Sequence, residues 1–322
     1  AGIRSEYAFG TAASGTRYFI TNAAVASVSP DGLVTAGLSE GSTYLTVING
    51  VAEAVVPIKV ESAPAPGPVT IGTAGGLAQA ADGSITTIAP GALEGDTTVN
   101  IVNLDAVADL PDGYTAPEGF DFAAGIRIDI TDEDLNVPMQ LAVRTSLPEG
   151  TQVWFFRADQ WPDIDGNLVN VWMQEDSGIV DANGYARTSS PPWDGITSAG
   201  VYFLGAGFNL GAIVTSLPFG VFRGTPAAMM CLGGGTTPSA VSFRDVGTLV
   251  QSYMSVPAGV QDFDIVAVQP DGTLESQRNS VEINAGRVAH FETTFDNAPT
   301  DSGPGSRPAI TSAQLTFDGE GP

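Results

Sequence analysis

The stretch VASVSPDGLVTA, which runs from Val25 to Ala36, decides the fold class. Two short apolar runs flank Pro30, Asp31 and Gly32, a combination that is typical of a tight turn. Short valine-containing runs bounded by turn residues are typical of β-strands. The stretch therefore predicts two strands joined by a turn.

Strand-like alternation recurs outward from this stretch through the whole chain. In several runs every second residue is apolar, which buries one face of a strand and leaves the other in water. Turn dipeptides such as Asp-Gly and Asn-Gly separate the runs, and no stretch repeats apolar residues at the helical period. We therefore predict an all-β protein of antiparallel sandwiches. The clearest runs are Ile126-Ile128-Ile130, Val56-Ile58-Val60 and Ala313-Leu315-Phe317.

Proline- and glycine-rich segments divide the chain into modules. SAPAPGPV begins at Ser62, and DNAPTDSGPGSRPA begins at Asp296; such compositions are typical of linkers. GAGFNLGA, from Gly205, marks a softer junction. The prediction is three tandem immunoglobulin-like β-sandwich modules and a C-terminal extended strand. The modules span residues 1–62, 69–206 and 207–297, with a linker at 63–68 and a linker plus strand at 298–322.

Charge excludes several classes of partner. The chain has 322 residues, and 36 acidic against 12 basic residues give a formal charge of −24. A surface this negative repels nucleic-acid phosphates and anionic lipid headgroups, so we expect no nucleic-acid partner. The stretch from Gly195 to Phe222 is uncharged but rich in glycine. We interpret it as two strands around a module junction, with no membrane insertion.

The first module carries a recognisable motif. Residues 25–60 read VASVSPDGLVTAGLSEGSTYLTVINGVAEAVVPIKV. The D-G-L-V-T-A turn followed by a G-S-T-x-L-T-V strand resembles the bacterial immunoglobulin-like repeats of intimin- and invasin-type surface proteins. The resemblance implies a spacer or adhesion module at a bacterial cell surface, and such repeats also occur in phage structural proteins.

The second and third modules carry weaker resemblances. GGLAQAADGSITTIAPGALEGDTTVNIVNL (75–104) and GITSAGVYFLGA (195–206) resemble the β-sandwich of ankyrins, zonula occludens proteins and netrin receptors. Some members of that family cleave themselves at a His-Phe-Ser site, but residues 199–203 read AGVYF, so self-cleavage is not implied here. Residues 252–293, with a V-P-A-G turn, are similar to an uncharacterised exported β-sandwich family, which implies architecture only.

Catalytic residue types are scarce. His290 is the only histidine, and its place in an alternating run predicts a solvent-facing strand position. The sequence has no nucleophile-elbow motif to partner it, and one histidine with one cysteine makes a zinc site improbable. Acidic residues are plentiful, and the densest run, DITDED from Asp129, is predicted to be a solvated loop. We predict that the protein is not an enzyme.

Calcium is the one ligand ion that the residues suggest, and no other cofactor is predicted. DQWPDIDGN offers Asp159, Asp163, Asp165 and Asn167 near one turn, and hard oxygen ligands in a loop suit Ca²⁺. The EF-hand register is broken because Trp161 stands two positions before Asp163. An ordinary acidic β-turn is the alternative reading.

All four tryptophans fall in the second module. Aromatic side chains on a β-surface can stack on sugars, which makes a glycan a candidate partner. The alternative is core packing, since tryptophans are usually well buried. The residues are Trp154, Trp161, Trp172 and Trp193.

The ends of the chain suggest an assembly. The first module is predicted to lack its first strand, which would expose core and unpaired backbone groups. PAITSAQLTFDG, from Pro308, is predicted to be a strand without a module of its own on a flexible linker, and it resembles the missing strand. We hypothesise that this strand completes the first module of the next copy, head to tail, by donor-strand complementation. A tandem protein with covalently continuous modules is the alternative. The predicted assembly residues are Ile310, Ala313, Leu315 and Phe317.

These expectations favour a non-enzymatic structural protein located outside the cell or at its surface. A head-to-tail contact that does not close into a ring builds an open filament, and copies of the chain itself would be the partner. A surface-layer subunit would use the same contact. The alternative function is a cell-surface adhesin that binds glycan or calcium, and a third is a phage or virion decoration protein.

Overall fold

A computed structural model describes residues 15–30, 32, 34–37, 39–62, 64–131, 135–190, 193, 195–218, 227–233, 237–243, 249–268, 274–295 and 310–320. At 216–218, 242–243, 249–252, 275, 291–295 and 310–320 the description covers the backbone alone. Strands make up 61% of the chain and helix 1%, which confirms the all-β prediction. The helical part is a 3-10 turn at Val107–Asp109. None of the described helical segments has the length and hydrophobicity needed to cross a membrane.

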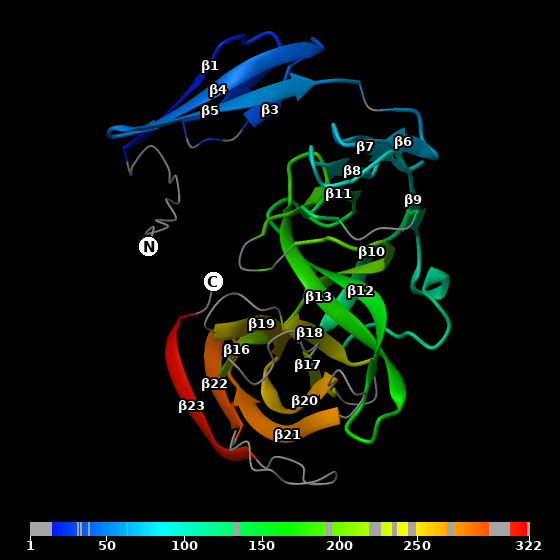
Figure 1. Ribbon diagram of the computed structural model, residues 1–322, viewed down its shortest axis with the longest axis vertical. Helices are drawn as coiled ribbons and strands as arrows, with labels where there is room; N and C mark the ends of the chain where they lie inside the picture. The colour runs from blue at the N-terminus through cyan, green and yellow to red at the C-terminus, as the bar shows by residue number, and fades with distance from the viewer. Residues whose placement is uncertain are drawn as a thin grey trace. The chain divides into compact units, whose positions relative to one another are not determined.

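The chain forms two compact units, residues 1–64 and 65–322. The division falls inside the proline-rich linker predicted at 63–68. Figure 1 shows strands in both units. In the first unit, a three-stranded sheet has the order β1-β4-β5, and β2 pairs with β3 separately. These strands are β1 (Thr16–Ile20), β2 (Ala26–Val28), β3 (Val34–Ala36), β4 (Gly41–Asn49) and β5 (Ala52–Val60).

The stretch that predicts two strands around a turn folds in that way. Val28 lies opposite Val34 and Ala26 lies opposite Ala36 in the β2–β3 pair. A second hairpin joins β4 to β5, where Gly50 adopts a φ of 61° that a residue with a Cβ rarely adopts. Local pattern and turn chemistry therefore account for both hairpins of the first unit.

A 14-stranded sheet dominates the second unit. Its main path is β21-β20-β17-β18-β13-β12-β15-β10-β9-β6, and β7, β8, β11 and β14 branch from it. The first strands are β6 (Val69–Ile71), β7 (Gly76–Gln79), β8 (Ile85–Ile88), β9 (Thr97–Leu104), β10 (Phe120–Ile130), β11 (Gln140–Arg144) and β12 (Gln152–Pro162). The others are β13 (Leu168–Val180), β14 (Tyr185–Thr188), β15 (Gly200–Gly207), β17 (Ala227–Cys231), β18 (Ser239–Phe243), β20 (Gly259–Val268) and β21 (Leu274–Ile283).

A four-stranded sheet, in the order β19-β16-β22-β23, completes the second unit. Two pairs of strands are parallel, β13 with β18 and β16 with β22. The prediction of purely antiparallel sandwiches is therefore wrong at these two pairs. The physical reason is that each pair joins strands far apart in the chain, which no tight hairpin constrains to run antiparallel. The strands are β16 (Leu210–Pro218), β19 (Leu249–Pro257), β22 (Arg287–Phe295) and β23 (Ile310–Glu320).

The core of the second unit crosses the predicted boundary at residue 206. Trp154 and Trp172 pack in one buried cluster with Met254, Val256 and Phe263, which follow that boundary in the chain. A second cluster is built around the strands between β6 and β15, with a smaller third one beside Trp161. The stretches predicted as separate second and third modules therefore share a core.

Candidate functional site

The first unit has an edge strand with little cover. Among the described residues β5 pairs with β4 alone. Val55 and Val56 are 55% and 45% exposed, although they are neighbours that point to opposite faces of the strand. An edge with unpaired backbone groups and exposed valines on both faces can accept another strand.

Buried apolar side chains are few in the first unit. The described ones are Val25, Ala26, Leu45 and Val47, and all three buried clusters of the chain's described part lie in the second unit. Val34, Tyr44 and Val55 are exposed. The described part of the first unit therefore buries little apolar surface, and burial is the main favourable term in folding.

The C-terminal strand is present and has a partner in its own chain. β23 runs antiparallel to β22, and Figure 1 shows it along the edge of that sheet. Three of the predicted assembly residues lie in one continuous register: Phe317 opposite Ala289, Leu315 opposite Phe291, and Ala313 opposite Thr293. Ile310 lies beyond a shift in register, opposite Phe295.

This pairing differs from the expectation of a strand without a sheet of its own. Without β23, β22 would be an edge strand with a row of unpaired backbone groups. A nearby strand from the same chain satisfies those groups at a low cost in chain entropy. Donation of the strand to another copy stays a prediction. Within the described residues, β23 bonds to a neighbouring strand on one side only.

The predicted calcium residues lie on the hairpin between β12 and β13, but not as one set. The carboxylate of Asp163 accepts hydrogen bonds from the backbone N–H groups of Asp165 and Asn167, both at 2.9 Å. These bonds to a backbone turn lower the pKa of Asp163. Asp159 instead forms an ion pair with Arg157, 2.8 Å from Oδ2 to a guanidinium nitrogen.

No group of three or more histidine, cysteine, aspartate or glutamate residues in the described part of the chain is placed to hold a metal ion. The carboxylate of Asp163 already accepts a hydrogen bond from the backbone N–H of Asn167 across the turn. Gly166 lies within this turn and has a φ of 85°. The hairpin geometry therefore matches the alternative reading of an acidic β-turn, and the calcium site stays a prediction.

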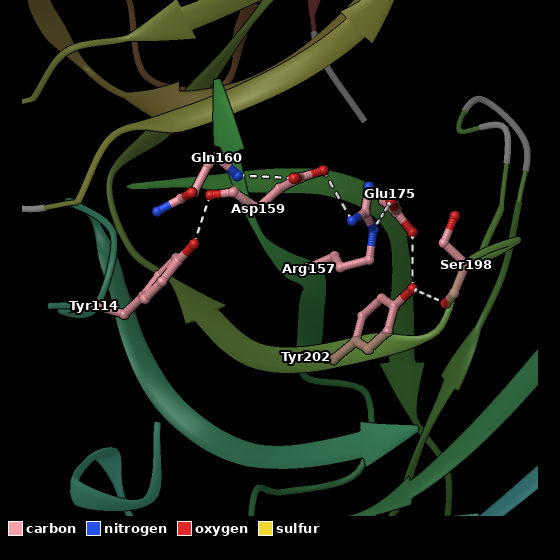
Figure 2. Close-up of polar contacts among 7 residues, drawn as sticks. All are labelled: Tyr114, Arg157, Asp159, Gln160, Glu175, Ser198 and Tyr202. Carbon is pink, nitrogen blue, oxygen red and sulfur yellow. Dashed lines mark hydrogen bonds and ion pairs between the residues drawn. The ribbon is translucent and has the colours of Figure 1, made fainter. Parts of the chain in front are cut away.

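A polar network that the sequence did not reveal lies on the neighbouring strands β12, β13 and β15 (Figure 2). The Arg157 side chain is only 19% exposed, and its Nε donates to Glu175 at 2.6 Å while a terminal nitrogen contacts Asp159. The Tyr202 hydroxyl lies 3.0 Å from Glu175 and 2.6 Å from the carbonyl oxygen of Ser198. Glu175 is therefore held between a guanidinium and a phenol.

A β-bulge places Glu175 in this network. Phe155 lies opposite Asp176 and Phe156 lies opposite Gln174, so Glu175 is the extra residue of a bulge in β13. An extra residue in one strand re-aims the side chains beside it. The sequence carries no signal for this position because Glu175 and Arg157 are 18 positions apart and meet only through the bulge.

The network holds one cation between two carboxylates. Burial alone would lower the pKa of Arg157, but the carboxylates of Glu175 and Asp159 outweigh it and hold that pKa above its ordinary value. Burial, aided by Asp159, raises the pKa of Tyr114, whose hydroxyl donates to the Asp159 carbonyl at 2.5 Å. Both carboxylates are engaged by Arg157, so this arrangement suits a structural lock rather than proton transfer.

Asp176 is fully buried beside the bulge. Its Oδ2 accepts from the hydroxyl of Ser190 at 2.6 Å, and its Oδ1 accepts from the N–H of Ser177 at 2.8 Å. Burial raises the pKa of Asp176, and the hydrogen bonds from Ser190 and Ser177 oppose that rise only in part. The side chain ties the segment that follows β14 to β13.

The tryptophans follow the core-packing reading. Trp172 is fully buried and donates its indole N–H to the carbonyl of Thr115 at 2.7 Å. Trp154 and Trp193 are also buried, and Trp161 is half-buried. A sugar platform built of these four rings is therefore absent from the described surface, and glycan binding stays a prediction. His290 is partly exposed on β22, next to the buried Ala289.

No protein-family model matches the chain, and no curated protein sequence matches it. The resemblances drawn from the motifs therefore stay predictions.

Proposed function

We propose that this protein is a non-enzymatic structural protein of the cell exterior that assembles head to tail by strand addition. One observation carries the proposal: the described part of the first unit combines few buried apolar side chains with β5, a strand that pairs on one side only and has valines exposed on both faces. The occupant that we assign to this edge is β23 of a second copy. Contacts of this kind between different surfaces build open chains when they do not close into a ring.

The outer edge of β23 supports this assignment. β23 bonds to β22 along one side, so a copy can keep that ladder and still offer the other side to β5 of its neighbour. Backbone hydrogen bonds would then hold the two copies together, and burial of Val55 and Val56 would add apolar contacts. Strand addition therefore needs no unfolding of the second unit.

The sequence of β5 restricts where a strand can be added. Pro57 has no N–H to donate, and Lys59 adds a charge near the end of the strand. Proline and lysine on an edge oppose indiscriminate pairing. The segment from Ala52 to Val56 is thus the part of β5 that suits a partner strand.

A matched pair of variants tests the proposal on the full chain. Val55→Lys places a charge on the proposed contact, whereas Val260→Lys makes the same change at a 71% exposed valine of β20 in the second unit. We expect filaments or concentration-dependent oligomers, seen by negative-stain microscopy and light scattering, to be lost in Val55→Lys and kept in Val260→Lys. The proposal is wrong if the wild-type chain stays monomeric at high concentration. It is also wrong if both variants assemble equally well.

A further inference from the structure

The second unit contains a surface pocket of about 130 Å³ that neither the motifs nor the assembly account for. It lies between β12, β16, β19 and the turn that enters β22. The residues that line it are Gln152, Trp154, Leu210, Tyr253, Ser255 and Arg287, together with Gly211, Ala212 and Gly286. A cavity near 150 Å³ holds a benzene-sized molecule, so this pocket has room for about one six-membered ring.

The two aromatic side chains that line the pocket, Trp154 and Tyr253, are each packed against another aromatic ring. Trp154 packs edge-on against Phe120 with ring centroids 5.4 Å apart, and Tyr253 packs edge-on against Trp193 at 5.3 Å. The indole N–H of Trp154 also donates to the hydroxyl of Ser255 at 2.9 Å. Walls fixed in this way need no reordering when a ligand enters, which favours binding.

Arg287 supplies a cation at this pocket. The turn before it is tied to β16 because the N–H of Gly286 donates to the carbonyl of Leu210 at 2.8 Å. A Cβ on Gly211 would lie 2.4 Å from the carbonyl oxygen of Asn284, so glycine allows this close approach of turn and strand. Among side chains that the structure describes, no carboxylate forms an ion pair with Arg287, and none of the described lining residues is acidic.

This combination is unusual in a chain of charge −24. The lining of the pocket combines aromatic side chains with convergent polar groups, and both kinds of group occur in small-molecule sites. A guanidinium matches the geometry of a carboxylate and can bind it with two hydrogen bonds. Gln152 adds an exposed amide that can bond to hydroxyl groups.

We infer that this pocket binds a six-membered ring that carries a carboxylate, with the ring between Trp154 and Tyr253 and the carboxylate on Arg287. The shared chemistry has two sources, a hexuronate unit of an acidic polysaccharide and an aromatic acid. None of the described lining residues belongs to β5 or β23, although Arg287 lies opposite Glu320 of β23 in the β22–β23 ladder. The inference concerns ligand binding and does not rest on the assembly proposed above.

The test is a titration of the full chain with glucuronate, glucose and benzoate at physiological salt, where charges more than about 8 Å away are screened. Binding is measured by calorimetry and by the NMR signal of the Trp154 indole N–H. We expect glucuronate or benzoate to shift that signal and glucose to bind at least about tenfold more weakly, because it lacks the group that would contact Arg287. Tighter binding of glucuronate assigns the sugar source, and tighter binding of benzoate assigns the aromatic one.

Two variants make the test specific. Arg287→Gln is expected to weaken binding of the charged probes about tenfold or more. Arg17→Gln removes the same charge from an exposed strand residue of the first unit and is expected to leave binding unchanged. The inference is overturned if no probe binds in the millimolar range, if glucose binds as well as glucuronate, or if Arg287→Gln binds like the wild type.

Discussion

The two units of this protein are built from the same kind of strand but hold together differently. In the second unit, large aromatic rings such as Trp172, Phe155 and Phe203 are fully buried in the core clusters. In the first unit, the largest buried apolar side chains are those of Leu45, Val25 and Val47 within its described residues. The difference shows that alternation alone forms strands, whereas the size of the alternating side chains decides how much a sandwich buries.

The two units also differ in their ion pairs. The second unit contains ion pairs with at least one buried partner, such as Arg157 with Glu175 and the buried Asp264 with the half-exposed Arg278. In the described part of the first unit, Lys59 forms an ion pair with Glu61, and these side chains are 67% and 50% exposed. Exposed pairs of this kind contribute little to stability.

The largest expected effect is at Trp172, and it tests whether the second unit depends on its aromatic core. Trp172→Ala should lower the free energy of unfolding of this unit by about 3–5 kcal/mol, because it leaves a cavity and an unpaired carbonyl at Thr115. Urea unfolding followed by circular dichroism measures it. Leu168→Ala, on the same strand but 66% exposed, is the control and should change stability very little. Equal effects of the two variants would contradict this account of the core.

The next effect tests the buried network. Glu175→Gln removes the carboxylate that accepts from the Nε of Arg157, while Asp159 stays as a counter-ion. Loss of one hydrogen bond between charged groups should lower the free energy of unfolding by about 2 kcal/mol. The same urea experiment measures it, with the exposed Glu282→Gln as the matched control. A cost no larger than that of the control would show that the network adds nothing to the second unit.

A smaller effect on stability is expected in the first unit, and it tests whether the two units unfold separately. Val47→Ala removes two buried methyl groups and should lower the stability of this unit by about 1.5 kcal/mol. All four tryptophans lie in the second unit, so their fluorescence reports on that unit alone, whereas circular dichroism reports on both. We expect the Val47→Ala transition to move in circular dichroism and to stay in place by fluorescence. A shift in both signals would mean that the units unfold together.

The smallest effects concern pH, and they carry opposite signs at two aspartates of the second unit. The pKa of Asp176 is raised by burial from 3.8, so its contribution to stability is present below pH 3.8 and is lost as the pH rises through the raised value. The cost of Asp176→Asn should therefore shrink as pH rises. A cost that grows with pH would contradict the buried, raised-pKa assignment.

Asp163 behaves in the opposite way because turn hydrogen bonds lower its pKa. Its contribution is present above pH 3.8 and is lost as the pH falls through the lowered value. Asp163→Asn should therefore destabilise the β12–β13 hairpin at neutral pH and have no effect at the acid end. Urea midpoints measured across the acid range check both aspartates in one series.

Sequence reasoning captured the local part of this fold. The hairpin at Val25–Ala36 and the strands at Ile126–Ile130 and Ala313–Phe317 follow from period-two alternation and turn residues. Each of these signals is contained in neighbouring residues. That is why they could be found without knowing which strands pair.

The non-local part could not be predicted in this way. Pairing of β16 with β22 brings together residues that are about 75 positions apart, and nothing in either strand specifies the other. The meeting of Arg157 with Glu175 depends on a bulge, and the pocket at Arg287 depends on four separate elements. The partner of β23 was missed for the same reason, since any sheet edge with open backbone groups can accept a strand.

Gln174 has a consequence for the way the two sheets of the second unit stay aligned. Its amide donates to the carbonyl of Ser255 at 2.7 Å and accepts from the N–H of the same residue at 3.0 Å, so one side chain takes the place of a neighbouring strand at that rung. Sliding β13 past β19 would break both bonds at once in a buried setting, where neither group could turn to water. This single amide therefore resists sliding of the two strands. A force along the chain would have to break both of its hydrogen bonds before β13 and β19 could move past each other.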